Sequence, residues 1–151
     1  MITELDIKHY TYWLPLYFLY EEGTIIIRLQ ELFTNTESEN IKIGDKTIEN
    51  VYKMESTKNS KIYDVIFNTV HFFQVYDELK HIEKTDEQFD KGIIRKYSKS
   101  NLMKFIENNT LFKNVYENLF NELKHYCVRT STDWFNIVGL SDPIIKIINP
   151  E

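Results

Sequence analysis

The first half of the chain is a succession of β-forming segments separated by short polar breaks. Residues 10–20 are rich in Tyr, Trp, Phe and Leu, residues 24–33 contain a run of Ile, and residues 61–77 hold many Ile, Val and Phe side chains. Such side chains pack well on a pleated sheet. This half of the chain is therefore predicted to form antiparallel strands.

Two tight turns are expected to connect these strands. Residues 21–23 end in Gly23, and Gly44-Asp45 lies between two short apolar stretches. Glycine accepts a positive φ angle at little cost, so both positions favour hairpins. The polar residues 34–40 and 56–60 predict loops, and Asn68-Thr69 predicts a bend.

The second half contains helical signals. Leu111, Val115 and Leu119 lie four residues apart, which predicts an amphipathic helix over residues 111–120, and Ser98 to Asn101 offer helix-capping residues. Residues 132–138 are interpreted as a short helix that ends at Gly139. Further strands are predicted at 93–97, 126–130 and 144–148.

These elements predict an α+β fold. We expect a mainly antiparallel twisted sheet of about five to eight strands, with two or three helices of the C-terminal half packed on one face. The 151 residues include only four Gly and three Pro, and no linker-like stretch divides them, so residues 1–151 are expected to form a single domain.

Alanine is absent, which favours a bacterial host with an AT-rich genome.

Charge and targeting signals narrow the function. The net charge is −5 and no basic stripe is visible, which argues against a nucleic-acid partner. The longest apolar run, residues 12–20, is too short to cross a membrane, and the N-terminal residues do not resemble a signal peptide. Cys127 is the only cysteine, which agrees with a reducing compartment, and we expect a cytoplasmic protein.

Motifs for cofactors, nucleotides and metals are not found. The four glycines are isolated and form no phosphate-binding loop, so no cofactor is expected. Asp77 and His81 have a helical metal-ligand spacing, but no further ligands accompany them. A solvated connector is the preferred interpretation of that segment, and no metal site is expected.

His125 and Cys127 form the alternative candidate site. They are two residues apart on a predicted strand, so they share a face and would suit a thiol beside a base. A buried cysteine and a packed histidine explain the same spacing. No catalytic residue is assigned. A binding protein is the preferred interpretation of the chain, and an enzyme is the alternative.

Acidic and aromatic residues provide the candidate partner-binding site. An acidic segment would attract a basic protein, and its residues are Asp77, Glu78, Glu83, Asp86, Glu87 and Asp90. Aromatic side chains divide between core and surface, so some can act as interface anchors, among Tyr10, Tyr12, Trp13, Tyr17, Phe18, Tyr20, Trp134 and Phe135.

Several segments together resemble small bacterial proteins, some of which resemble immunity proteins of polymorphic toxin systems. These segments are residues 65–70, residues 73–78, the helix from Asn101, and residues 125–128 before residues 142–144. The resemblance implies a small acidic protein that neutralises a toxin. The alternative is a small-molecule-binding or enzymatic domain with an aromatic-lined pocket near His125 or Cys127, and homo-oligomerisation is compatible with both.

Overall fold

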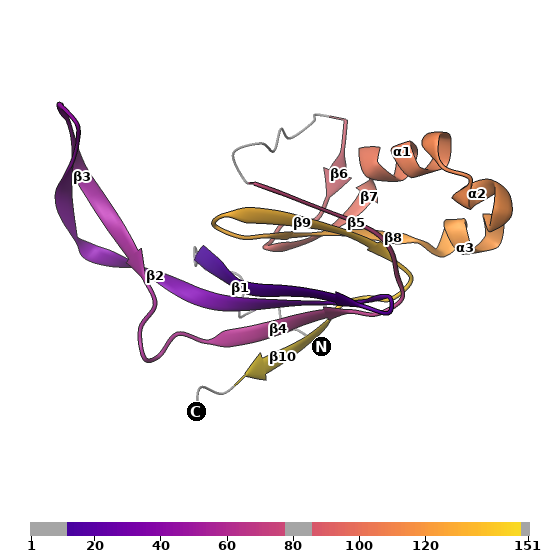
Figure 1. Ribbon diagram of the computed structural model, residues 1–151, viewed down its shortest axis with the longest axis horizontal. Coiled ribbons are helices and arrows are strands. Elements are labelled where there is room, and N and C mark those ends of the chain that lie inside the picture. The colour runs from indigo at the N-terminus through magenta and orange to yellow at the C-terminus, as the bar shows by residue number, and fades with distance from the viewer. Residues whose placement is uncertain (1–11, 78–85, 149–151) are drawn as a thin grey trace.

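Two antiparallel sheets face each other (Figure 1). The structure is a computed structural model and describes residues 12–77 and 86–148. The first sheet contains β1 (Tyr12–Glu21), β2 (Thr24–Ile43), β3 (Lys46–Glu55), β4 (Ile62–Phe67) and β10 (Ile144–Ile148). The second contains β5 (Val70–Asp77), β6 (Gln88–Phe89), β7 (Ile94–Lys99), β8 (Lys124–Arg129) and β9 (Asp133–Gly139).

The strand orders differ from the chain order. The first sheet runs β1-β2-β4-β10, with β3 paired to the far part of β2, and the second runs β5-β9-β8-β7-β6. The helices α1 (Asn101–Asn109), α2 (Phe112–Val115) and α3 (Glu117–Glu122) connect β7 to β8. The expected antiparallel sheets and C-terminal helices are confirmed, but the strands form two sheets and not one.

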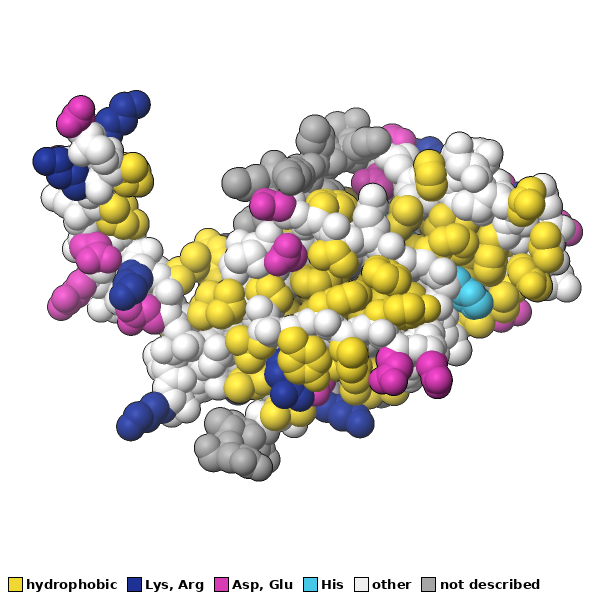
Figure 2. All heavy atoms as spheres, in the orientation of Figure 1, with side chains coloured by type: hydrophobic (Ala, Val, Ile, Leu, Met, Phe, Trp, Pro, Cys, Tyr) yellow, Lys and Arg dark blue, Asp and Glu magenta, His cyan; other side chains and the backbone are white. Residues whose placement is uncertain are grey.

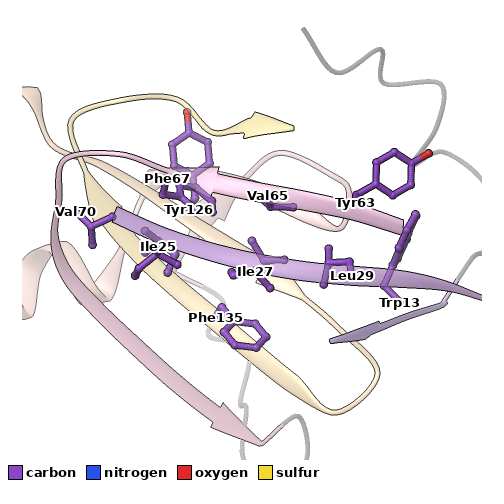
Figure 3. Close-up of a cluster of buried hydrophobic side chains, with 12 residues drawn as sticks. Trp13, Ile25, Ile27, Leu29, Tyr63, Val65, Phe67, Val70, Tyr126 and Phe135 are labelled. Carbon is purple, nitrogen blue, oxygen red and sulfur yellow. The ribbon is translucent and has the colours of Figure 1, made fainter. Parts of the chain in front are cut away.

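The hydrophobic core lies between the two sheets (Figure 3). Ile25, Ile27 and Leu29 of β2 are buried, while the residues between them are partly exposed, as strand alternation requires. Phe135 and Ile137 of β9 contribute from the second sheet. Each fully buried side chain of this size contributes about 1.5–3 kcal/mol, so this shared core holds the sheets together.

Both predicted hairpin turns are present. Glu22 and Gly23 have φ angles of 46° and 78° and join β1 to β2, as the right-handed twist of the strands favours. Gly44 has a φ of 60° and begins the turn between β2 and β3. The chain passes from the first sheet to the second at Asn68-Thr69, where Thr69 has a φ of 55°.

Two predicted elements are wrong. Residues 34–40 are not a loop, because β2 continues through them and pairs with β3. Residues 132–138 are not a helix: from Asp133 on they belong to β9, which lies between β5 and β8. A strand that is buried on both faces has a nearly continuous apolar run, and periodicity alone does not distinguish it from a buried helix.

The helices are shorter than predicted. Tyr116 has a φ of −131° and a ψ of 54°, which interrupts the predicted helix between α2 and α3. In α1, Ile106 is buried, whereas α2 and α3 bury no side chain completely. Phe112 of α2 lies with its ring centroid 5.2 Å from the rings of His71 and Phe72 in β5. α2 therefore contacts β5, and the predicted packing of the helices on one face of a sheet is confirmed only in part.

Among the described residues, no helix has the length and apolar character of a membrane span.

Candidate protein-binding surface

A two-stranded ribbon extends beyond the sheets (Figure 1). We call residues 34–54 the arm. It consists of the far part of β2, the turn at Gly44, and most of β3, and every residue in it except Val51 is exposed. A two-stranded hairpin is marginally stable in water by itself. The arm is therefore a part of the fold that adds little to the core and much to the surface.

Apolar side chains cover part of the arm. Ile41 lies directly across from Ile48, and Ile43 lies two residues further along β2 on the same face. Their exposed fractions are 38%, 50% and 62%, and Tyr52 is 53% exposed. Figure 2 shows hydrophobic side chains on the side of the arm that faces the body of the protein. Contiguous apolar surface of this kind is typical of interaction sites.

The arm also carries net negative charge. Its residues 34–54 contain four acidic and three basic side chains. Lys53 and Glu55 form an exposed ion pair of 2.5 Å, which stabilises the ribbon little. The remaining charges give the arm a negative field that would attract a basic partner.

A second apolar region lies where the edge strands of the two sheets meet. Phe73 of β5 has its ring centroid 4.9 Å from that of Tyr20 and 5.6 Å from that of Phe18. Tyr20 is 48% exposed and Phe73 is 43% exposed.

The predicted division of the aromatic residues between core and surface is visible. Trp13, Trp134 and Phe135 are buried and Phe18 is partly buried, whereas three tyrosines are exposed, namely Tyr12, Tyr17 and Tyr20. Tyr10 lies outside the described residues.

The described acidic residues of the predicted partner site make contacts within the protein. Glu87 Oε1 accepts a hydrogen bond from the backbone N of Asn101 at 2.9 Å. Asp86 accepts hydrogen bonds from the Asn101 side chain at 3.1 Å and from Lys104 at 3.5 Å, and the first of these contributes most to lowering the pKa of Asp86. These carboxylates thus accept hydrogen bonds from the first turn of α1, and their negative charge is favourable beside the N-terminal end of the helix dipole.

The other members of the acidic segment are dispersed. Asp90 accepts a hydrogen bond from the backbone N of Lys96 at 2.5 Å, between β6 and β7. Asp77 ends β5 and lies across from Asp133 of β9. Glu78, Glu83 and His81 lie outside the described residues. A role of this segment in partner binding stays a prediction.

His125 and Cys127 are both buried on β8, on the face opposite the core. Asn136 of β9 lies across from Cys127, and Tyr97 of β7 lies across from His125. The Tyr97 ring is stacked on the imidazole with a centroid distance of 4.1 Å. The two residues share a face, as the sequence predicts.

A hydrogen-bonded relay runs through His125. Its Nδ1 is 2.7 Å from Ser100 Oγ, and its Nε2 is 2.9 Å from Asn136 Oδ1. The amide oxygen only accepts, so Nε2 carries the hydrogen and Nδ1 accepts from the Ser100 hydroxyl. Burial lowers the pKa of His125 to about 4, which keeps the imidazole neutral at pH 7.

The relay has the order of a hydroxyl nucleophile, a base and an orienting amide. However, Ser100 is buried, and its Oγ accepts a hydrogen bond from the backbone N of Met103 at 3.1 Å, so it caps α1. This geometry supports a structural role for the relay, in which it fixes the start of α1 to β8 and β9. Sequence patterns did not indicate Ser100 or Asn136 as partners, because the three residues are far apart in the chain.

An aromatic-lined pocket lies where the arm joins the body. It encloses about 250 Å³, and its lining includes Tyr12, Trp13, Met54 and Ile93. Arg129 at the end of β8 also lines it. Neither His125 nor Cys127 does, so this pocket is separate from the relay.

Within residues 12–77 and 86–148, no cluster of three or more His, Cys, Asp or Glu side chains is arranged to hold a metal ion.

Comparison with known proteins gives no assignment: no family model, no curated protein and no solved structure matches this chain.

Proposed function

We propose that this chain is a protein-binding module that holds its partner with the arm. The observation that carries this proposal is the exposed apolar ribbon, in which Ile41, Ile48 and Tyr52 have no core to pack against. An extended strand pair presents side chains at regular spacing and is a common way to contact another protein. A partner that covers these side chains would remove their unfavourable exposure to water.

The partner is a basic protein, and we propose a toxin that the module neutralises. The net charge of −5 and the excess of acidic side chains on the arm support an electropositive partner. The resemblance to immunity proteins, which rests on four segments of sequence, supports the same class. In this role the module acts by occluding the surface that the toxin uses.

Affinity capture from the native host, followed by mass spectrometry, tests the proposal. We expect one basic protein to be recovered in amounts near those of the tagged chain. The variant Ile48→Lys should lose it, because a charge would enter the apolar contact. Thr47→Lys is the matched control: it adds the same charge one residue away, on the other face of the arm, and should keep the partner.

Two results would contradict the proposal. The first is capture of no specific protein, and the second is equal recovery by Ile48→Lys and Thr47→Lys. If capture is retained by both arm variants but lost on changing Asp86 and Glu87, the acidic segment and not the arm is the contact.

A second candidate function is enzymatic, and the relay of Ser100, His125 and Asn136 favours it. If Ser100 acts as a nucleophile, a fluorophosphonate probe should label it in the folded protein, and His125→Gln should prevent labelling. Absence of labelling in native protein would leave the relay with its structural role.

A further inference from the structure

The outer face of the first sheet, away from the core, is unusually apolar. The strand registers place its side chains in three rows that cross β1, β2, β4 and β10 in that order. The rows are Leu19–Ile26–Ile66–Ile144, Tyr17–Arg28–Asp64–Lys146 and Leu14–Gln30–Ile62–Ile148. A sheet face in contact with water normally carries polar side chains. Here two of the three rows are almost wholly aliphatic.

The middle row contains the charges of this face. Arg28 binds Asp64 with two hydrogen bonds, of 2.7 and 2.8 Å, and its Cζ lies 4.8 Å from the centroid of the Tyr17 ring. Lys146 lies directly across from Asp64 on the neighbouring strand. The row therefore reads aromatic, cation, anion, cation across the sheet.

If this row meets the same row of a second copy in the opposite direction, each side chain faces one that it can bind. Consider a two-fold axis that lies in the interface, parallel to the strands and between β2 and β4. It turns a second copy over so that each row meets the same row in the opposite direction. Tyr17 then faces Lys146 of the second copy, and Arg28 faces Asp64 of the second copy. The first contact places a cation over an aromatic ring. In the second, the Arg28–Asp64 pair of one copy lies against the same pair of the other copy in reverse order, so opposite charges face each other across the axis.

The row that begins with Leu19 also pairs with itself in the opposite direction. Under this axis Leu19 faces Ile144 of the other copy, and Ile26 faces Ile66. Leu19 is 42% exposed and Ile144 is 48% exposed, so both have surface to bury. We propose that this face binds a second copy of the chain as a two-fold symmetric dimer, on a surface separate from the arm. Two-fold dimers of this kind pair the same surface patch on both subunits.

Pairing through the face is favoured over pairing through the β1 edge of the sheet. β1 is the edge strand on one side, and it contains Pro15, which has no N–H to donate, next to an irregularity between Pro15 and Tyr17. Proline and bulges on edge strands prevent a further strand from adding to a sheet.

The size of the face sets the expected affinity. Four strands about 4.8 Å apart and three rows about 6.8 Å apart cover about 19 by 20 Å, or about 400 Å² on each copy. The total of about 800 Å² on two copies is below the range of about 1,200–2,000 Å² of stable complexes, which indicates a weak, concentration-dependent dimer. Sedimentation equilibrium from about 2 to about 200 μM is the suitable measurement.

The decisive experiment uses two complementary variants. Leu19→Lys and Ile144→Glu should each weaken the dimer about a hundredfold, because each would bury two unpaired charges at the interface. Mixed together, they should form a heterodimer, since Lys at position 19 then faces Glu at position 144 while the other contact keeps Leu19 and Ile144. Ile43→Lys on the arm is the matched control and should dimerise like the parent protein.

Lys146→Glu provides a second test at an exposed position, so the fold of this variant should not change. It should weaken dimerisation about tenfold by placing an anion over the ring of Tyr17 of the other copy. The proposal is overturned if the parent protein is monomeric at every concentration, which would leave the face to a different occupant. It is also overturned if the variants dimerise normally, or if the mixture of two folded, monomeric variants stays monomeric.

Discussion

Burial determines the charge of His125. The imidazole lies beneath Tyr97 and between Ser100 and Asn136, with both ring nitrogens in hydrogen bonds. Its pKa falls from 6.5 to about 4, mainly because burial disfavours the charged form. In the unfolded chain the same group takes up a proton near pH 6.5. The folded state therefore has its full stability above pH 6.5 and loses part of it as the pH falls toward 4.

We predict that this loss depends on His125. The difference in pKa corresponds to about 3 kcal/mol in the free energy of unfolding between pH 6.5 and pH 4. His125→Gln should remove most of this pH dependence, as measured by urea denaturation at several pH values. His71→Gln, at an exposed histidine, should keep it, and an unchanged slope in His125→Gln would contradict the assignment.

Gly139 is required by close packing. It lies in β9, and a Cβ atom there would be 2.8 Å from the carbonyl oxygen of Thr69 and 3.3 Å from Val70 Cα. Both are backbone atoms of the turn that connects the two sheets, so they cannot move aside easily.

Gly139→Ala should therefore destabilise the protein by about 1–3 kcal/mol in urea denaturation. Gly44→Ala is the comparison, because a Cβ at Gly44 meets nothing within 4 Å, although its φ of +60° is strained for alanine. Gly44→Ala should lower the free energy of unfolding less than Gly139→Ala does. Equal losses in both variants would contradict the claim that close packing makes Gly139 the more sensitive position.

The first part of β2 belongs to the packed sheets, and its second part belongs to the arm. β2 has 20 residues; the first nine alternate between buried and partly buried, and the rest are exposed. We predict that hydrogen exchange divides the strand at the same place. The amides of residues 25–30 should exchange at least about a hundredfold more slowly than those of residues 35–43.

Deuterium uptake followed by NMR or mass spectrometry measures this contrast. Val65 and its neighbours in β4 serve as the slow reference, because β4 lies inside the sheet. Uniform protection along the whole of β2 would mean that the arm is stabilised by contacts in solution, such as a bound partner.

The sequence predicts individual elements better than their assembly. β-Branched and aromatic residues identify the first part of β2, β4 and most of β8, and glycine chemistry identifies the hairpin turns. Residues 132–138 were misassigned because an interior strand and a buried helix have similar apolar runs. Residues 34–40 appeared to be a loop because pairing with β3, and not burial, holds them extended.

The candidate sites show the same limit. The arm was not predicted, although Ile41 and Ile48 flank a recognisable turn at Gly44, because nothing local indicates that a hairpin extends away from the core. The relay joins Ser100, His125 and Asn136 through pairings that only the tertiary structure creates. The acidic segment was visible in the sequence, but its contacts with Asn101 and Lys104 were not.

At the level of the whole molecule, one core joins both sheets. Trp13 belongs to the first sheet and Trp134 to the second, and both are buried. The core contains residues from each sheet, so neither sheet keeps its buried inner face without the other. Unfolding should therefore be a single cooperative transition.

The two tryptophans can test this directly. Trp13→Phe leaves fluorescence from Trp134 alone, and Trp134→Phe leaves fluorescence from Trp13 alone. In each variant the fluorescence transition should coincide with the far-UV circular dichroism transition in urea. A fluorescence midpoint that differs from the circular dichroism midpoint in either variant would show that the sheets unfold separately.

The pairing of β10 with β4 has a consequence for synthesis of the protein. β4 lies between β2 and β10 in the finished sheet, yet about eighty residues separate β4 and β10 in the chain. While the ribosome is still making the second sheet, β4 has one open edge, and its apolar residues 62–67 resemble an aggregation-prone segment. Rapid elongation through the second sheet, or a chaperone that covers β4, would protect the nascent chain until β10 closes the edge.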